Sequence, residues 1–357
     1  MPNKTPLYDA HVAAGGKMVE FAGWELPIHY GSQIEEHHAV RRAAGMFDVS
    51  HMTVVDIQGS GARDYLRRLL ANDIAKLKEA GQALYGCMLN EAGGVLDDLI
   101  TYYLADDFYR TVVNAATREQ DLAWMREQAA GFEVEITERD DLAMVAVQGP
   151  QARERVIEAL GAAAADSLKP FRALSHGDYF LARTGYTGED GFEVLMPASQ
   201  APSFWQAMLD ADVSPCGLGA RDSLRLEAGL NLYGQDMNAE TTPLESNLGW
   251  TVAFEPADRD FIGRDALEKQ KSEGVTRRLV GLVLGRGGIP RTGSVVHASA
   301  GEGQVTSGTF GPTTECPVAL ARIPTGDFET VEVELRGRRL EASVVKPPFV
   351  RMGMVKI

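Results

Sequence analysis

An internal repeat is the feature that most constrains the fold of this chain. The stretch at 54–70, VVDIQGSGARDYLRRLL, returns at 144–160 as MVAVQGPQARERVIEAL. Each copy has the pattern of a strand with alternating apolar residues, then a glycine turn, then an amphipathic helix. Several matched positions are polar, and no secondary-structure pattern requires them, so duplication explains the match better than chance similarity. The matched pairs include Gln58 with Gln148, Gly59 with Gly149 and Arg63 with Arg153.

The segments that follow the two copies are also similar in kind. After the first copy come strands joined at turn-forming residues around 90–94 and 105–107, then a helix near 117–129 and a strand near 132–136. After the second copy come a hairpin over 177–197 and a helix over 199–211. Each half therefore predicts a β-α-β-β-α-β unit, the split βαβ arrangement.

From about residue 277 the pattern changes. Short β-rich runs such as RRLVGLVLG and PVALARI alternate with Gly, Pro and Thr, and almost no helical period is present. This pattern predicts a small all-β barrel or sandwich. The chain of 357 residues also exceeds the roughly 250–300 residues at which a single core stops growing, so we expect more than one domain.

Charge and composition argue against several function classes. The formal net charge of −15 gives an acidic surface that repels phosphate backbones, so we expect no nucleic-acid partner. The widely separated Cys87, Cys216 and Cys316 indicate neither a disulfide framework nor a cysteine zinc site, and they suit a reducing compartment. The N-terminal residues lack the pattern of a signal or transit segment, and no apolar run approaches the ~20 residues that span a bilayer. We therefore expect a cytoplasmic protein with no membrane partner.

Common catalytic motifs are absent from the sequence. It has no GxxxxGK[ST] phosphate loop, no complete GxGxxG, no GxSxG elbow and no HExxH pair. A cluster of Glu35, Glu36, His37 and His38 lies in a helical segment, where adjacent side chains face different ways. Metal ligands on a helix are four residues apart, so we expect no metal site in this segment.

Two stretches carry more polar residues than their context requires. In GGVLDDLI, Asp97 and Asp98 interrupt an apolar strand, and alternation turns one of them toward the interior or a cleft. Alternation does not decide which one, and an edge strand with two solvated acids is the alternative. In GYTGEDGFEV, Tyr186 and Glu193 add an aromatic face and a carboxylate to a hairpin. Such a carboxylate can take two hydrogen bonds from the amino-pyrimidine edge of a pterin, and an ordinary hairpin with solvated acids is the alternative.

A predicted helix, GLGARDSLRLEAGL, follows this hairpin. Arg221 and Arg225 lie four residues apart on it and face the same way. An arginine at this position can clamp a carboxylate with two hydrogen bonds, or it can pair with Glu227 or another nearby acid. The sequence leaves both possibilities open.

These stretches also carry a family resemblance. The sequence resembles the T-proteins of the glycine cleavage system, the aminomethyltransferases that use tetrahydrofolate. The similarity runs essentially from end to end, through TPLYDAHVAAGGKMVEFAGWELPIHY, RRAAGMFDVSHM, LNEAGGVLDDLI, GYTGEDGFEV, GARDSLRLEAGLNLYGQDM, GQVTSGTFGPT and KPPFVR.

The resemblance implies an α+β fold with three domains in a cloverleaf. Two domains would be duplicated split-βαβ (ferredoxin-like) units, the third a C-terminal all-β barrel, and folate would lie in the channel between them. We expect a discontinuous first domain of 1–50 and 140–275, a second domain of 51–139 and a barrel domain of 276–357.

The resemblance also implies roles for individual residues. Asp98, the second acid of GGVLDD, resembles the family's catalytic aspartate near the bridging nitrogens of folate, and Glu193 resembles the carboxylate that binds the pterin. Tyr85, Tyr186 and Asn114 resemble residues that line the folate site. Arg221 and Arg351 resemble the family's substrate-contacting arginines, and Met52 and Tyr233 resemble wall residues.

The activity implied by the resemblance is a one-carbon transfer without metal, pyridoxal phosphate or covalent enzyme intermediate. The donor would be an aminomethyl group on the dithiol arm of lipoylated H-protein, the expected partner, and the acceptor would be tetrahydrofolate. Two alternatives on the same fold remain: a tetrahydrofolate-dependent demethylase, and a folate-binding regulatory protein without transferase activity. The presence of Asp98 argues against the regulatory protein, because simple binding has little use for a carboxylate beside the reacting nitrogens.

Overall fold

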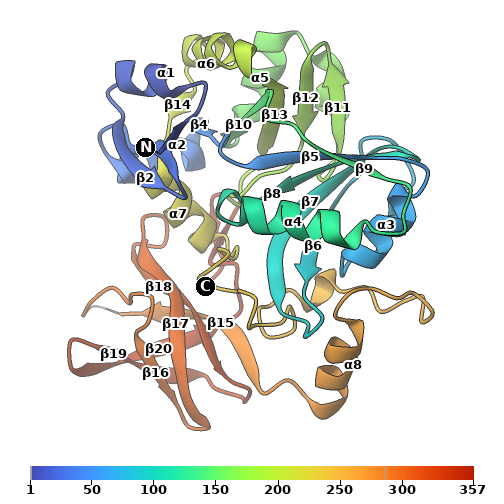
Figure 1. Cartoon of the computed structure of the whole chain (residues 1–357). Coiled ribbons are helices and arrows are strands. Elements are labelled where there is room, and N and C mark those ends of the chain that lie inside the picture. Colours follow the sequence, from blue (N-terminus) through green and yellow to red (C-terminus); the bar gives the residue numbers. More distant parts are fainter. Residues whose placement is uncertain (1, 286) are drawn as a thin grey trace.

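The computed structural model describes residues 2–285 and 287–357, which form two α+β units and a C-terminal β-barrel (Figure 1). The barrel, in orange to red, occupies the lower left of that view. Within the described residues no helix combines the length and apolar character needed to cross a membrane. The α-helices are α1 (Tyr8–Ala13), α2 (Gln33–Arg42), α3 (Ala62–Leu69), α4 (Arg118–Gln128), α5 (Ala152–Leu160), α6 (Ala201–Asp210), α7 (Leu218–Glu227) and α8 (Arg264–Glu273).

The first copy of the repeat opens a five-stranded sheet. Its order is β6-β7-β8-β5-β9, and all neighbouring strands are antiparallel. With α3 after β5 and α4 after β8, this is the order of a split βαβ unit that is extended at one edge by β6. The strands are β5 (Thr53–Gln58), β6 (Ala83–Leu89), β7 (Val95–Ala105), β8 (Phe108–Val113) and β9 (Glu135–Glu138).

The second copy opens a six-stranded sheet with the order β11-β12-β13-β10-β4-β14. This sheet repeats the first strand for strand, except that β4 from the N-terminal segment is inserted between β10 and β14. Strand β4 runs antiparallel to β10 and parallel to β14. The strands are β4 (Gly45–Asp48), β10 (Leu142–Gln148), β11 (Ala173–His176), β12 (Tyr179–Ala182), β13 (Gly191–Pro197) and β14 (Ser214–Pro215).

The two units share their turn geometry, which confirms the predicted duplication. Gly59 and Gly149 have φ values of 134° and 132°, a region that L side chains rarely adopt. Both turns also bring the glycine against another backbone, because an added Cβ would lie 2.1 Å from the carbonyl oxygen of Glu133 at Gly59 and 2.4 Å from that of Ala43 at Gly149. Glycine is therefore required at both copies of the turn.

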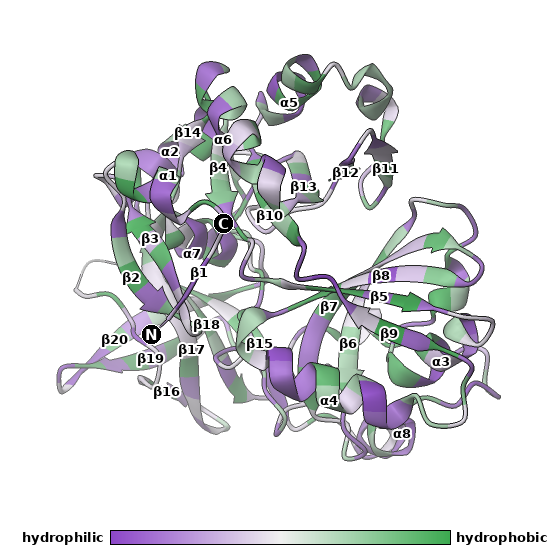
Figure 2. Cartoon of the chain, turned by 45° about the horizontal axis from the view of Figure 1, so that its top comes forward, coloured by the Kyte–Doolittle hydropathy of each residue, from purple (hydrophilic) through white to green (hydrophobic). Residues whose placement is uncertain are grey.

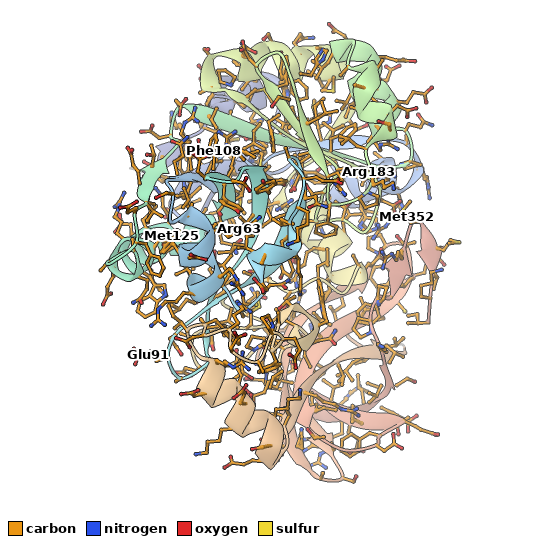
Figure 3. The ribbon with its side chains drawn as sticks, turned by 90° about the vertical axis from the view of Figure 1, so that its right-hand side faces the viewer. Arg63, Glu91, Phe108, Met125, Arg183 and Met352 are labelled. Atoms are coloured by element: carbon orange, nitrogen blue, oxygen red, sulfur yellow. The ribbon has the colours of Figure 1, made fainter. Side chains whose placement is uncertain are left out.

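Each sheet has two buried faces, because alternate side chains point to opposite sides. One face packs on the unit's own helices, as Ile57 does with α3 and α4 (Figure 3, where Arg63 of α3 and Met125 of α4 are labelled). The other faces of the two sheets pack on each other, with Tyr102 of β7 edge-on to Phe180 of β12 at 5.2 Å between ring centroids. In Figure 2 the apolar colouring accordingly runs along the strands of both sheets.

The C-terminal region forms the predicted barrel. Its closed order is β15-β18-β17-β16-β19-β20, and β20 pairs back onto β15. Leu282, Val305 and Ala319 belong to the apolar cluster that fills it. The strands are β15 (Arg277–Leu284), β16 (Val295–Ala298), β17 (Gly301–Gly311), β18 (Cys316–Pro324), β19 (Thr330–Leu335) and β20 (Arg338–Val345).

Two small sheets complete the structure. The N-terminal sheet has the order β1-β3-β2, and a two-stranded hairpin follows the barrel near the C-terminus. The strands are β1 (Asn3–Lys4), β2 (Lys17–Phe21), β3 (Trp24–His29), β21 (Val350–Arg351) and β22 (Met354–Val355).

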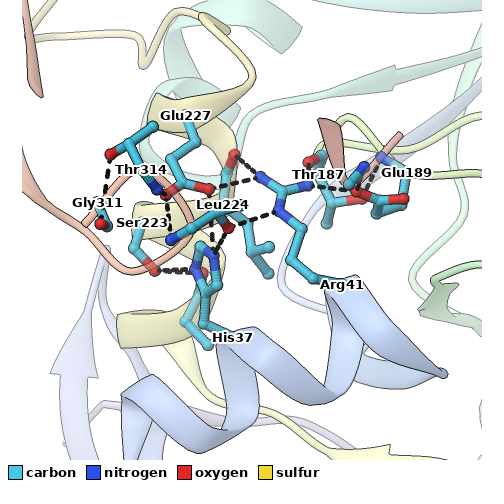
Figure 4. Close-up of polar contacts among 12 residues, drawn as sticks. His37, Arg41, Thr187, Glu189, Ser223, Leu224, Glu227, Gly311 and Thr314 are labelled. Atoms are coloured by element: carbon cyan, nitrogen blue, oxygen red, sulfur yellow. Dashed lines mark hydrogen bonds and ion pairs between the residues drawn. The ribbon is translucent and has the colours of Figure 1, made fainter. Parts of the chain in front are cut away.

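A buried ion network joins the N-terminal segment, α7, the hairpin loop and the barrel (Figure 4). The Arg41 guanidinium of α2 donates to Glu227 of α7 at 3.0 Å and to Glu189 of the loop at 2.7 Å. Glu227 also accepts hydrogen bonds from the backbone of Thr313, in the loop between β17 and β18. Burial opposes ionisation of Glu227, but the hydrogen bond and charge of His37 and the charge of Arg41 lower its pKa to about 2. These contacts hold α7 against α2 and against the loop between β17 and β18 of the barrel.

Candidate active site

Asp98 lies on β7, opposite Cys87 of β6, on the sheet face that is turned toward the second unit. The Tyr85 hydroxyl donates a hydrogen bond of 2.8 Å to its Oδ2. The side-chain amide of Asn114, directly after β8, donates one of 3.0 Å to its Oδ1. Both oxygens are therefore held by neutral donors from adjacent strands, and the carboxylate is fixed in position.

The environment of Asp98 favours its neutral form more than water does. Burial and the charge of Asp97 raise the pKa of Asp98 to about 7, against the opposing hydrogen bonds from Tyr85 and Asn114. No described lysine or arginine forms an ion pair with it, so its charge is not neutralised locally. Near neutral pH this carboxyl can hold a proton, release one, or stabilise a cation beside it.

Asp97 faces the opposite side of β7 and is fully buried. Its oxygens accept the backbone N–H of Asn114 at 2.9 Å and the Asn114 side-chain amide at 2.8 Å. The same amide also donates to Asp98, so Asn114 joins the two acids. The structure thereby decides what alternation left open: Asp98 is on the sheet face turned toward the second unit, and Asp97 is on the face turned toward α4.

Glu193 lies on β13, on the face of the second sheet that packs toward the first. Its Oε2 accepts a hydrogen bond of 2.6 Å from Thr184, and Thr184 lies 3.2 Å from the hydroxyl of Tyr102 on β7. No described residue donates to its other oxygen, Oε1. Glu193 is therefore positioned through one oxygen, while the other can accept a hydrogen bond from a ligand.

Tyr186 and Arg221 link the two acids. The Arg221 guanidinium carbon lies 4.8 Å from the centre of the Tyr186 ring, and its buried Nη1 has no partner among the described residues. Burial raises the pKa of Tyr186, and the charges of Asp98 and Arg221 both act on this hydroxyl, which donates to the carbonyl of Asn231. The ring thus lies within electrostatic reach of residues from both units.

The two arginines of α7 differ in their partners. Arg225 is buried, and it pairs with Asp236 at 2.8 Å and with Asp222 at 2.8 Å. Glu227, the partner that the sequence suggested for it, pairs with Arg41 instead. Of these two arginines, Arg221 is the one with a buried donor that no described residue engages.

The remaining predicted residues lie at the edges of this site. Met52 is half-buried against the cluster between the two sheets. Tyr233 packs near Tyr85, and burial together with the charges of Asp97, Asp121 and Asp98 raises its pKa to about 12. Arg351 is exposed on β21, in a hairpin whose next residues bond the loop that follows Tyr186.

Two residues near the site were missed by the sequence analysis. Trp250 is 69% exposed and stacks on Tyr85, with ring centroids 5.9 Å apart. His51 is buried with its Nδ1 unpartnered, and burial together with the charge of Arg221 lowers its pKa to about 4. His51 precedes Met52 directly in the sequence, but the residues around it show no pattern that predicts its burial. Trp250 does not belong to a segment with helical or strand periodicity, so the sequence does not place it near the site.

The cavities elsewhere in the molecule do not contain the acidic residues of the candidate site. A cavity of about 490 Å³ lies between Phe254, Arg264 and Lys271, but it contains none of the predicted site residues. A second, of about 10 Å³, lies beside Arg221 and has room for roughly one water molecule. Within residues 2–285 and 287–357, no group of three or more His, Cys, Asp or Glu side chains is arranged to hold a metal ion. The candidate site is therefore defined by the side chains of Asp98, Glu193 and Arg221 and not by either cavity.

Comparison with known proteins shows two family matches. The GCVT N-terminal domain matches residues 7–256, and the glycine cleavage T-protein C-terminal barrel domain matches residues 277–351. Glycine cleavage system aminomethyltransferase T from Bartonella henselae is similar over 100% of both chains, with 37% identity and a TM-score of 0.92.

Two further solved structures are much less similar. Heterotetrameric sarcosine oxidase from Corynebacterium sp. U-96 is 14% identical, over 58% of this chain and 94% of that one, with a TM-score of 0.38. The regulatory subunit of aspartate kinase from Thermus thermophilus is 13% identical, over 47% and 97% of the two chains, with a TM-score of 0.27. Scores this low support no argument about the present chain.

Proposed function

Because this chain belongs to the glycine cleavage T-protein family, we propose that it transfers the methylene carbon of aminomethyl-dihydrolipoyl H-protein to tetrahydrofolate. The products are methylenetetrahydrofolate, ammonia and dihydrolipoyl H-protein. The observation that best supports this reaction is the Asp98 carboxylate, which is fixed by two neutral donors and forms no ion pair with any lysine or arginine that the structure describes. Such a group has little use in a folded core but suits a site where positive charge develops.

In this proposal the Asp98 carboxylate stabilises positive charge on the transferring carbon and on the folate nitrogens. One folate nitrogen attacks the methylene carbon as ammonia leaves, and a second folate nitrogen attacks it as the carbon–sulfur bond breaks. The two N–H protons end on the ammonia and on the released thiol, and the carbon bridges the two nitrogens. Positive charge builds on the carbon and on the attacking nitrogen, and a carboxylate fixed beforehand stabilises it without reorganising. With a pKa of about 7, Asp98 can also take up the proton that the attacking nitrogen loses.

Glu193 and Arg221 orient the acceptor in this proposal. The free Oε1 of Glu193 accepts from the amino-pyrimidine edge of the pterin, and the unpartnered Nη1 of Arg221 donates to an acceptor atom of the substrate. Tyr186, Tyr85 and Asn114 line the folate, and Met52 and Tyr233 form the wall. Holding the nitrogen and the carbon in line supplies much of the rate enhancement.

H-protein is the proposed partner, bound transiently so that its arm reaches Asp98. The net charge of −15 gives no general attraction to an acidic partner, so a local basic patch has to guide docking. Our candidates are the segments at Arg291 and Arg351, and both arginines are exposed. Because the hairpin of Arg351 bonds the loop behind Tyr186, a partner on it lies near the proposed site.

Reconstitution tests the function directly. The purified chain is mixed with tetrahydrofolate and lipoylated H-protein charged with the aminomethyl group, and ammonia and methylenetetrahydrofolate are measured. We expect both products in equal amounts, and neither when H-protein is omitted. Folate turnover with a methyl donor alone would favour the demethylase, whereas folate binding without any turnover would favour the regulatory protein.

A further inference from the structure

Asp97 and Asp121 form a buried pair of carboxyls that the reaction above does not use. Asp121 lies in the first turn of α4, and it is fully buried. No N–H or O–H of the described residues donates to either of its oxygens, since the neighbouring Thr117 hydroxyl donates to the carbonyl of Asn114 instead. Its carboxyl lies against that of Asp97, and the charges acting on the pair are those of aspartates, with no cation among them.

This contact requires a proton. Two ionised carboxylates repel each other when they touch inside a protein without a cation, so such a pair keeps one proton and titrates as a unit. Burial accordingly raises the pKa of Asp121 to about 7, and burial and the charge of Asp121 raise the pKa of Asp97 well above its ordinary value, so the pair retains its last proton through Asp97 as well as Asp121.

The hydrogen bonds indicate where the proton lies. Both oxygens of Asp97 are acceptors for Asn114, one for its backbone N–H and one for its side-chain amide. Both oxygens of Asp121 lack a donor. A proton held between the carboxyls of Asp121 and Asp97 preserves both Asn114 bonds and gives Asp121 a partner.

We propose that Asp121 is a positioning residue: the one proton that it shares with Asp97 joins the two carboxyls and so fixes Asn114 and, through it, Asp98. This inference rests on the role proposed for Asp98. The Asn114 amide is the only element of the relay that touches both acids, because it donates to Asp97 at 2.8 Å and to Asp98 at 3.0 Å among the described contacts. The proton also keeps the charge of the buried pair at −1, beside a carboxylate that itself has to ionise.

Two substitutions that keep the branched side-chain shape and the number of heavy atoms separate a hydrogen-bonding role from a packing role. Asp121→Asn keeps a donor to Asp97, and we expect kcat to stay close to that of the unaltered protein. Asp121→Leu removes the donor, and we expect kcat to fall on the order of 10- to 100-fold, as when reacting groups are misplaced by about 1 Å. KM for tetrahydrofolate should change little, because Asp121 does not touch the proposed folate site. Glu119→Leu, at an exposed position in the same turn, is the matched control.

Equal losses of kcat in folded Asp121→Asn and Asp121→Leu proteins would overturn the proposal, as would an active Asp121→Leu protein. Melting temperatures establish that each variant is folded. If Asp121→Leu does not fold, the spectroscopic test below decides the question with Asp121→Asn alone.

Infrared difference spectroscopy detects the proton without turnover. The pair should keep its one proton above the pKa of Asp98, because the pKa of Asp97 is raised well above its ordinary value. At such a pH we expect the carbonyl stretch of a protonated carboxylic acid in the unaltered protein and in Asp98→Asn, but not in Asp121→Asn. Persistence of the band in Asp121→Asn, or its absence from the unaltered protein, would show that the pair does not hold the proton. This measurement needs neither folate nor H-protein. A band that behaves as expected in a protein without transferase activity would therefore refute the proposed function and leave the proton assignment standing.

Discussion

Asp97 and Asp98 are consecutive residues of β7 that face opposite sides of one sheet and are joined by a single amide, that of Asn114. Asp97 lies on the side of α4, with Leu99 and Tyr103, whereas Asp98 lies on the side of Ile100 and Tyr102, facing the second unit. Asp97 can therefore help to position Asp98 without contacting the same ligand. Substitutions of the two residues are consequently expected to have different effects on activity.

Replacing Asp98 by Asn should remove most turnover and leave folate affinity nearly intact. The carboxylate stabilises charge that exists mainly in the transition state. The activation free energy of turnover should therefore rise by about 2–4 kcal/mol, and kcat should fall accordingly. Asp97→Asn should have a milder effect, because it changes the support of Asn114 and a neighbouring charge but leaves the Asp98 carboxyl itself in place. Steady-state kinetics and equilibrium folate binding check this prediction, and equal losses of kcat in the two variants would contradict the assignment of Asp98.

Glu193→Gln should weaken folate binding more than it lowers kcat. The amide places a donor where the pterin edge also donates, so a buried hydrogen bond is lost at a cost of about 1.5–3 kcal/mol, or a rise of roughly 10- to 150-fold in Kd. Calorimetric titration with tetrahydrofolate measures this change. Glu135→Gln, at an exposed position of β9, is the control and should bind like the unaltered protein. Unchanged affinity in Glu193→Gln would place the pterin elsewhere.

The pH dependence of kcat/KM should show an acidic limb from Asp98. The ionised form is the active one, so activity should rise with pH through about 7, where burial and the charge of Asp97 have moved the pKa of Asp98. Asp97→Asn removes that negative charge. Ionisation of Asp98 then becomes easier, and the limb should move to lower pH. A limb that moves to higher pH in Asp97→Asn would be inconsistent with a direct charge effect.

Arg41→Met should destabilise the protein strongly. It leaves Glu227 and Glu189 buried without their cation, which costs about 3–5 kcal/mol of the free energy of unfolding. The neighbouring Arg42 is exposed, and Arg42→Met provides a control with the same chemical change. Urea unfolding measures both variants. Similar stabilities would show that the network joining α2, α7 and the barrel contributes little.

Raising the salt concentration should raise the KM for H-protein. Docking through exposed arginines such as Arg291 and Arg351 is screened beyond about 10 Å at 0.1 M salt. Free aminomethyl-lipoate, which needs no docking surface, should show much less salt dependence. An H-protein KM that is the same at low and high salt would argue against the basic patch, although not against the transferase activity.

The architecture of the two units and the barrel could be predicted from the sequence alone. Strand alternation, glycine turns and helical periodicity are local properties, and the repeat placed them twice in the same order. Gly59 and Gly149 illustrate this, because both adopt the same φ region for the same steric reason. The order of several specific motifs along the whole chain was likewise readable, and it indicated the family.

Only the tertiary structure decided which face of each strand meets which neighbour. Alternation separates Asp97 from Asp98 but does not say which lies under α4, and nothing in the sequence inserts β4 between β10 and β14. The pairing of Arg41 with Glu227 joins residues 186 positions apart, and Asp121 meets Asp97 through the packing of α4 on the sheet. Local periodicity fixes which side chains share a face, whereas long-range packing fixes what that face contacts, and the proposed site is composed almost entirely of such contacts.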